Sequence, residues 1–260
     1  TDPTYGAVNK LTSFNVYGTV TGTAGTVNIF DGVTVTGTVG NTVWSYDDQY
    51  AQYWIPGASY NFAAVVNADA VTQNELKMPT ALTYNTAGQK DLLYATASVN
   101  NASANQGAVN MNFSHLLSKA QFTVTSNTAG GYYHSVTNIK ISNFETGTYT
   151  IADGTWAGTT AKDIVFGAVN EVTAASGAKT NDTQMLLVPN AATFDVTFTV
   201  DLYKNGTKLG TETKSIAVEN DLVKGNSYNF TIACSVGNPI KFTVTNDPAW
   251  ADPTTDVTVQ

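Results

Sequence analysis

The sequence contains no arginine and only one cysteine, Cys234, among its 260 residues. A single cysteine excludes an intrachain disulfide, a cysteine-based zinc site and a redox pair. Cys234 lies in a run of alternating apolar residues from Tyr228 to Val236, so we expect a buried thiol rather than a nucleophile. The stability of the fold must therefore come from its apolar core.

Charged side chains are scarce as well. They make up 12% of the chain, and 20 acidic against 12 basic residues give a formal net charge of -8. Nucleic acids and anionic membrane surfaces are bound through clustered Lys or Arg, which this sequence lacks. No stretch is long and apolar enough to cross a bilayer, and no signal-peptide pattern opens the sequence. We therefore expect no nucleic-acid partner and no transmembrane segment.

Groups for catalysis or metal binding are also missing. The two histidines, His115 and His134, have no carboxylate at ligand spacing, and no acid, base and nucleophile share a motif. The pair at positions 47–48 is not followed by the oxygen ligands of a calcium loop. The glycine-rich turn at 21–25 lacks the Lys and helix of a phosphate loop. The sequence thus predicts no enzyme, no metal site and no cofactor.

What the sequence does contain is the pattern of an all-β protein. Hydrophobic residues make up 42% of the chain, and they alternate with polar residues in many short runs. The clearest run starts at Phe194 and continues to Tyr203. Asn205-Gly206 then predicts a two-residue hairpin turn, and a bulge near Gly210 is needed to keep the apolar residues in register.

The first part of the chain carries two alternating runs and an aromatic block. The runs cover residues 14–20 and 27–35, and Asp31-Gly32 is a candidate tight turn. The aromatic residues that follow are Trp44, Tyr46, Tyr50, Tyr53 and Trp54. Such a block forms either a carbohydrate-binding platform or packing in the core and at sheet edges, and we favour packing.

The alternation changes phase in the middle of the chain. Apolar side chains occupy odd positions from Val109 to Phe113 and even positions from Ala120 to Val124. Successive side chains of a strand point to opposite faces, so the change requires an inserted residue, a bend or a change of sheet. We predict a hinge here between two β-rich halves. The predicted hinge residues are Phe113, His115, Leu116 and Leu117.

Residues 113–124, Phe-Ser-His-Leu-Leu-Ser-Lys-Ala-Gln-Phe-Thr-Val, resemble a signature of the fimbrillin-like proteins, the type V pilins. In that signature an apolar strand ends in Phe-x-His-Leu-Leu-x-Lys and a second strand follows. Other similar motifs are Asp-Leu-Leu-Tyr-Ala at 91–95, Met-Leu-Leu-Val-Pro-Asn at 185–190, Gly-x-x-Tyr-x-Phe at 225–230, and Trp250. The family often has Pro-Gln where this chain has Pro-Asn. The resemblance covers nearly the whole chain.

The resemblance implies a fold and a function. The fold would be two antiparallel β-sandwich (transthyretin-like) domains in tandem, residues 1–117 and 118–260. The function would be that of a structural subunit of a fimbria, exported as a lipoprotein precursor and held at the outer membrane of a Gram-negative bacterium. Some fimbrillin-like precursors are matured by an Arg-specific protease, which a chain without arginine would pass uncut.

The resemblance also implies assembly by strand exchange. Removal of an N-terminal strand would open a groove in the first domain, and a strand from the C-terminal region of another pilin subunit would fill it. An open groove presents unpaired backbone groups, which an added strand satisfies. No strand pattern precedes Leu11, so we expect the groove beside residues 11–20 and the donor after Trp250. The predicted assembly residues are Leu11, Phe14, Val16, Val257 and Val259.

Three functions remain open at this point, and the one with least support is a secreted enzyme whose site is not visible in the sequence. The resemblance favours the fimbrial subunit, whose partners would be other subunits and, as further candidates, ligands on host or bacterial surfaces. The alternative is a glycan-binding or adhesive β-sandwich module at the cell surface. That alternative requires Trp44 and Trp54 to be exposed on one face.

Overall fold

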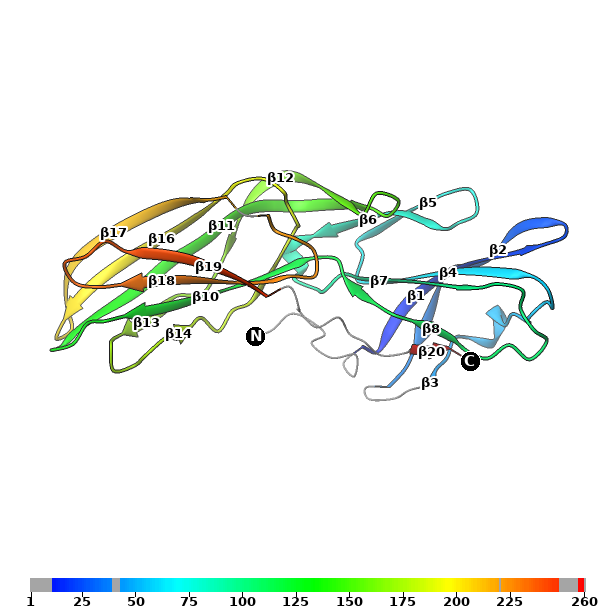
Figure 1. The fold of residues 1–260 in the computed structure, drawn as a ribbon, viewed down its shortest axis with the longest axis horizontal. Helices are drawn as coiled ribbons and strands as arrows, with labels where there is room; N and C mark the ends of the chain where they lie inside the picture. Colours follow the sequence, from blue (N-terminus) through cyan, green and yellow to red (C-terminus); the bar gives the residue numbers. More distant parts are fainter. Residues whose placement is uncertain (1–10, 39–42, 220, 248–256, 260) are drawn as a thin grey trace.

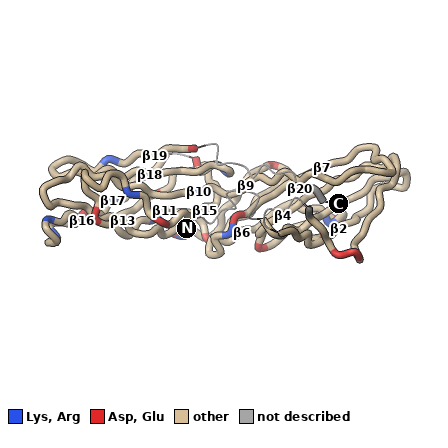
Figure 2. The backbone as a smooth tube through the Cα atoms, turned by 90° about the horizontal axis from the view of Figure 1, so that it is seen from below, with Lys and Arg blue, Asp and Glu red and all other residues tan. Residues whose placement is uncertain are grey.

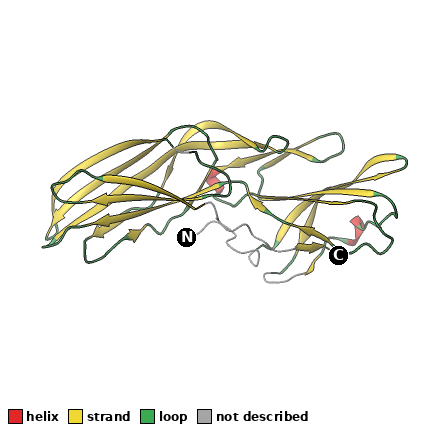
Figure 3. Ribbon diagram, viewed as in Figure 1, coloured by secondary structure: helices red, strands yellow, loops and turns green. Residues whose placement is uncertain are grey.

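The computed structural model describes residues 11–38, 43–219, 221–247 and 257–259. Of these, Val43 and residues 257–259 are described by their backbone alone. Within these residues the helical segments are two short 3-10 turns, η2 (Asp48–Tyr50) and η3 (Thr86–Gly88), and strands dominate the rest (Figure 3). The prediction of an all-β protein is confirmed. No helix in the described part of the chain is long and apolar enough to cross a membrane.

One sheet has five strands in the order β2-β1-β4-β7-β9, all antiparallel to their neighbours. The strands are β1 (Ser13–Gly22), β2 (Gly25–Thr36), β4 (Ser59–Val66), β7 (Leu93–Val99) and β9 (Ser114–His115). β1 is an interior strand of this sheet, because β2 pairs with one of its edges and β4 with the other.

The hairpin between β1 and β2 turns between Gly22 and Gly25, which pair with each other. The expected turn at Asp31-Gly32 is therefore wrong, since both residues lie inside β2. Gly32 has a φ of +68°, and the register between β2 and β1 shifts at the position opposite Tyr17. Gly32 therefore lies in a β-bulge, which like a tight turn can require a residue with positive φ.

A seven-stranded sheet has the order β17-β16-β11-β6-β5, and β12 and β13 also pair with β11. Its strands are β5 (Ala70–Gln73), β6 (Pro79–Asn85), β11 (Tyr132–Thr150), β12 (Thr155–Val165), β13 (Val169–Val172), β16 (Phe194–Lys204) and β17 (Thr207–Val218). The long strand β11 pairs with β16 over its first part and with β6 over its last part. One sheet thus contains strands from both halves of the sequence.

The hairpin of β16 and β17 agrees with its prediction in detail. Lys204 pairs with Thr207, and the two turn residues Asn205 and Gly206 have φ values of 49° and 82°. The register shifts so that Leu202 pairs with Gly210, which confirms the bulge. The bulge keeps the apolar residues of both strands on the same face.

A third sheet has the order β14-β10-β18-β19, and β15 also pairs with β10. Its strands are β10 (Ser118–Ser126), β14 (Lys179–Thr180), β15 (Met185–Leu187), β18 (Ser227–Cys234) and β19 (Lys241–Asp247). The pair of β10 and β18 is parallel, while the other pairs are antiparallel. A fourth, small sheet has the order β3-β20-β8, with β3 (Val43–Trp44), β8 (Val109–Met111) and β20 (Val257–Val259).

The molecule is elongated, with β1, β2 and β4 toward one end and β16, β17 and β18 toward the other (Figure 1). We call these the β1 end and the β16 end. At the β16 end an apolar cluster that includes Phe122, Phe198 and Phe230 fills the space between the second and third sheets. At the β1 end a separate cluster includes Phe14 and Phe62. The arrangement is consistent with packed β-sheets at both ends.

A third cluster joins the two ends. It combines Tyr17 and Val65 of the first sheet with Leu82 of β6, Leu117 of the central connection and Leu186 of β15. These residues are separated by more than half of the sequence but pack together in the middle of the molecule. The ends are therefore connected by an apolar core and not by a backbone linker alone.

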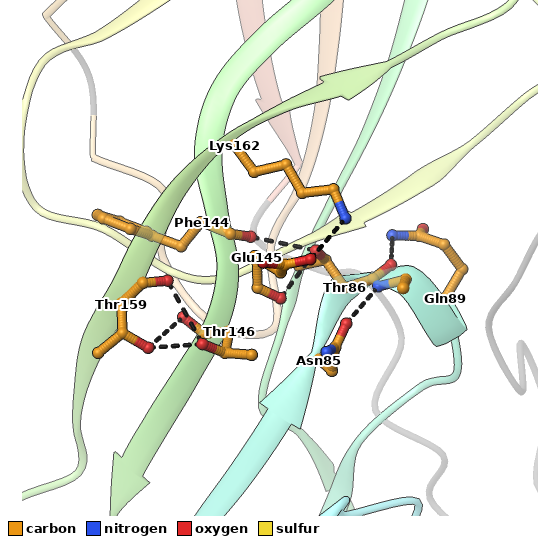
Figure 4. Close-up of polar contacts among 9 residues, drawn as sticks. Asn85, Thr86, Gln89, Phe144, Glu145, Thr146, Thr159 and Lys162 are labelled. Carbon is orange, nitrogen blue, oxygen red and sulfur yellow. Dashed lines mark hydrogen bonds and ion pairs between the residues drawn. The ribbon is translucent and has the colours of Figure 1, made fainter.

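Polar contacts support the same connection (Figure 4). The hydroxyl of Thr86, at η3, donates to the carbonyl oxygens of Phe144 (3.1 Å) and Glu145 (3.0 Å) on β11. The side chain of Gln89 bonds both the N–H and the carbonyl of Leu186, at 2.7 and 3.0 Å. These bonds hold the segment after β6 onto strands of the β16 end.

Candidate assembly site

The change of phase in the sequence coincides with a change of sheet. β8 belongs to the small sheet, β9 to the first sheet and β10 to the third. The predicted hinge residues along this path are all buried, with 2% of Phe113, His115 and Leu116 exposed and none of Leu117. Of the three explanations for the phase change, the structure shows a change of sheet, whereas a hinge between two β-rich halves stays a prediction.

The hinge residues are held by contacts that come from distant parts of the chain. His115 Nδ1 lies 2.8 Å from Asp91 Oδ2, and both side chains are fully buried. The indole N–H of Trp156, on β12, donates to the carbonyl oxygen of Leu116 at 2.8 Å. No carboxylate lies close to His115 in the sequence, because Asp91 is on a preceding segment that the pairing of β7 with β9 brings alongside it.

The assembly residues of the first strand lie in the core of the β1 end. Leu11, Phe14 and Val16 are 2%, 1% and 4% exposed. The ring of Phe14 packs 5.3 Å from the ring of Trp44 and 5.2 Å from that of Phe113. Thus the structure brings an assembly residue and a hinge residue into contact, although they are far apart in the sequence.

The expected position of the groove must be corrected. β1 is paired on both edges over residues 15–21, so an incoming strand finds no unpaired backbone row there. The physical reason is that β4 pairs with the edge of β1 to which the sequence pattern had assigned no neighbouring strand. Residues before Leu11, which bear on the removed strand, lie outside the described residues.

The C-terminal strand β20 occupies a position between two strands of the β1 end. It is antiparallel to β8, with Val257 opposite Met111 and Val259 opposite Val109. It is parallel to β3, with Val259 opposite Trp44. The predicted donor residues Val257 and Val259 therefore lie beside the first sheet of the same chain, next to the core that contains Phe14 and Val16.

An apolar pocket of about 400 Å³ opens next to this small sheet. Its floor is formed by core residues of the first sheet, among them Val16, Phe30 and Phe62. Its rim is formed by Tyr46 and the segment 52–54 on one side and by residues 106–109 on the other. The aromatic residues on the rim belong to the block noted in the sequence, whereas no sequence pattern indicated residues 106–109.

The aromatic block divides between core and surface. Trp44 is 3% exposed, so it cannot form a platform together with Trp54 as the glycan-binding alternative requires. Trp54 is half-buried and packs edge-on against Tyr60 at 4.6 Å, while Tyr53 is 87% exposed. The preference for packing over a platform holds for Trp44 and Trp54, whereas Tyr50 and Tyr53 are exposed.

The described residues offer little other chemistry. Among them no group of three or more His, Cys, Asp or Glu side chains is placed to hold a metal ion. Cys234 is buried as expected, and this burial raises the pKa of its thiol to about 12. Acidic and basic positions are distributed along the backbone of the described residues (Figure 2).

Comparisons with known proteins point in one direction. The profile of a family described as fimbrillin-like matches residues 4–248. A fimbrial protein from Bacteroides vulgatus has a similar fold, with a TM-score of 0.65 and 14% identity over 92% of this chain and 93% of that one. A protein named for cell adhesion from Bacteroides uniformis gives a TM-score of 0.59 and 17% identity over 96% and 94% of the two chains. No curated protein sequence matches.

Proposed function

Because the chain belongs to the fimbrillin-like family, we propose that it is a structural subunit of a bacterial surface fimbria that assembles by strand exchange. The observation that carries the proposal is the position of β20. A strand at the C-terminal end of the chain pairs with two strands of the β1 end, through residues 257–259 among those that the structure describes. The same strand of a neighbouring subunit can make the same pairs.

Strand exchange is energetically reasonable at this site. Each ladder hydrogen bond contributes about 0.5–1.5 kcal/mol, so a three-residue strand is held only by a few kcal/mol. Exchanging β20 of one molecule for that of another replaces each contact by an identical one, as in domain swapping. The equilibrium is then set by subunit concentration, and the rate by release of the strand from its own chain.

The core beneath β20 supports the role of the predicted assembly residues. Phe14 packs on Trp44, the register partner of Val259, and on Phe113. In this proposal Leu11, Phe14 and Val16 form the floor of the acceptor groove and do not pair with the donor. The donor residues are Val257 and Val259.

The remaining parts of the proposal follow from the family. The chain would be a lipoprotein precursor that is exported to the outer membrane of a Gram-negative bacterium and processed by an Arg-specific protease. The two tandem domains, 1–117 and 118–260, would share the sheet in which β6 pairs with β11. The first domain would provide the groove and the second the donor strand.

Removal of the donor strand tests the proposal. A chain ending at residue 256 should fold but form no fibres, and a peptide Thr-Asp-Val-Thr-Val-Gln should raise its melting temperature. A peptide of the same composition with the order Thr-Asp-Thr-Val-Gln-Val should not, because its valines point to the other face of the strand. Electron microscopy and thermal unfolding measure the two effects. Fibres of the shortened chain would exclude β20 as the donor.

A further inference from the structure

Exposed apolar side chains gather at the two ends of the elongated molecule. The described part of the chain has nine large apolar residues that are exposed. Five of them belong to segments at the β1 end, in β2, around η2 and in the β5–β6 turn, and two to β17 and the β18–β19 turn at the β16 end (Figure 1). In that order they are Val27, Tyr50, Tyr53, Ile55, Leu76, Leu209 and Val236. Exposed apolar residues that are scattered singly are ordinary, whereas a group of them marks a contact surface.

The group at the β1 end is densest in residues 47–55, which we call the aromatic loop. Three of its side chains are exposed, namely Tyr50, Tyr53 and Ile55. The loop itself is held in place, because the carboxylate of Asp47 accepts a hydrogen bond from the N–H of Gln49 at 3.0 Å. The N–H of Ile55 donates to the hydroxyl of Tyr60 at 2.8 Å. A loop that is ordered before its partner arrives loses less conformational entropy on binding.

The β1 end is acidic. Residues 11–77 contain five acidic residues and one basic residue, Lys77. Asp48 is exposed in the aromatic loop and makes no ion pair with another described residue. The β5–β6 turn lies next to β2, because the side-chain amide of Asn28 donates to the carbonyl oxygen of Leu76 at 3.0 Å. The exposed apolar side chains of this end therefore lie among mostly negative charges.

The tip of the β16–β17 hairpin combines aromatic rings with lysines. Three half-buried tyrosines lie there, namely Tyr132, Tyr133 and Tyr203. The Nζ of Lys204 is 4.6 Å from the centre of the Tyr132 ring and donates to its hydroxyl at 3.1 Å. Lys208 is paired with Asp201 at 2.8 Å, whereas Lys204 has no carboxylate partner in the part of the chain that the structure describes. The hairpin tip therefore keeps a net positive charge.

We propose that the two ends are complementary, and that the aromatic loop of one molecule docks on the β16–β17 hairpin tip of a second copy of this chain. Asp48 and the tyrosines of the loop face Lys204 and the tyrosines of the tip, which pairs opposite charges and joins apolar surface. A second copy fits because its hairpin tip supplies the positive charge that the β1 end lacks, although the whole chain carries -8. The proposal rests on the role of a fimbrial subunit but does not use β20.

The proposed contact can repeat. It is heterologous, because it joins different surfaces of the two molecules. The surfaces lie at opposite ends of an elongated molecule, so each contact leaves one surface of either kind open (Figure 1). Repetition of such a contact gives an open filament and not a closed pair. It also holds neighbouring subunits together, which raises the effective concentration of a strand that is to be exchanged between them.

Charge reversal in the full chain tests the contact. Asp48→Lys and Lys204→Glu should each lower the association constant at low salt about fivefold, as measured by sedimentation velocity. A mixture of the two variants should recover the association of the parent, because every end then meets an end of opposite charge. No effect of either substitution, or a loss that the mixture does not recover, would overturn the proposal.

The control is the same change of charge outside the two surfaces. Asp153 is exposed in the turn between β11 and β12. Asp153→Lys should leave the association unchanged and should not restore it when mixed with Lys204→Glu. If Asp153→Lys restores it as well as Asp48→Lys does, the effect comes from net charge and the proposal is wrong.

The apolar part of the contact has its own test. Tyr53→Ala should weaken association about tenfold, because the exposed ring is buried in the contact. Val165→Ala removes an exposed apolar side chain on β12, outside both surfaces, and should have no effect. Equal association constants of these two variants would contradict the proposed surface.

These measurements can fail independently of strand exchange. Neither Asp48 nor Lys204 pairs with β20, so the stabilisation by the β20 peptide should be the same with and without the charge reversals. An inactive peptide together with the expected charge effects would contradict strand exchange alone. A parent chain that stays monomeric at about 1 mM and low salt would overturn the contact between copies. Binding of poly-lysine through Asp48 without self-association would assign the surface to another basic partner and overturn it too.

Discussion

His134 is the residue whose ionisation links the fold to pH. It lies on β11, is 4% exposed, and its Nδ1 is 3.0 Å from the hydroxyl of Ser126. Burial disfavours the charged imidazolium and lowers the pKa of His134 below its ordinary value of 6.5. The unfolded chain therefore takes up a proton first as the pH falls through 6.5. Stability is full above that pH and decreases below it, down to the lowered pKa of the folded state.

His134→Gln should reduce this dependence. We expect the parent protein to lose more unfolding free energy between pH 7.5 and 5.5 than the variant, whatever their difference at pH 7.5. Carboxylates contribute to both proteins and cancel in the comparison. Urea unfolding at several pH values measures the two slopes, and identical slopes would show that folding does not lower the pKa of His134.

At the scale of single elements, the turn of the β16–β17 hairpin depends on backbone conformation more than on contacts. Gly206 has a φ of +82°, and a Cβ added there meets no atom within 4 Å. Gly206→Ala should therefore cost about 1–2 kcal/mol from backbone strain alone.

Gly210 in the same hairpin is the matched control. It is equally open, but its φ is not positive, so Gly210→Ala should change the unfolding free energy by less than about 0.5 kcal/mol. Chemical denaturation of both variants measures the difference. An equal effect of the two substitutions would mean that the turn does not require a left-handed residue at position 206.

At the scale of the whole molecule, the central cluster connects the β1 end with the β16 end. Leu82 is fully buried in this cluster, so Leu82→Ala should cost about 2–5 kcal/mol. Because the cluster contains residues of both ends, hydrogen exchange should become faster in β1 and in β16 alike. Leu209→Ala, at a residue that is 53% exposed, should leave both unchanged. Faster exchange at one end only would show that the ends unfold independently.

The sequence alone determined most of the individual strands. Alternation predicted β16 with its turn and its bulge, because these features depend on residues that are close in the chain. The phase change at residues 113–120 indicated an inserted residue, a bend or a change of sheet for the same reason. The family motifs around it identified the class of protein, which no composition or spacing had done.

The tertiary structure alone decided which strands are neighbours. The alternation that makes a strand fits several sheet edges equally well, and the choice depends on contacts between residues far apart in the chain. Thus β4 occupies the edge of β1 where a groove was expected, and β6 joins β11 across the two halves. β20 pairs with β3 and β8, more than 140 residues before it. The candidate site consists of such non-local pairs, which is why some of its residues could be named from the sequence but its position and its remaining residues could not.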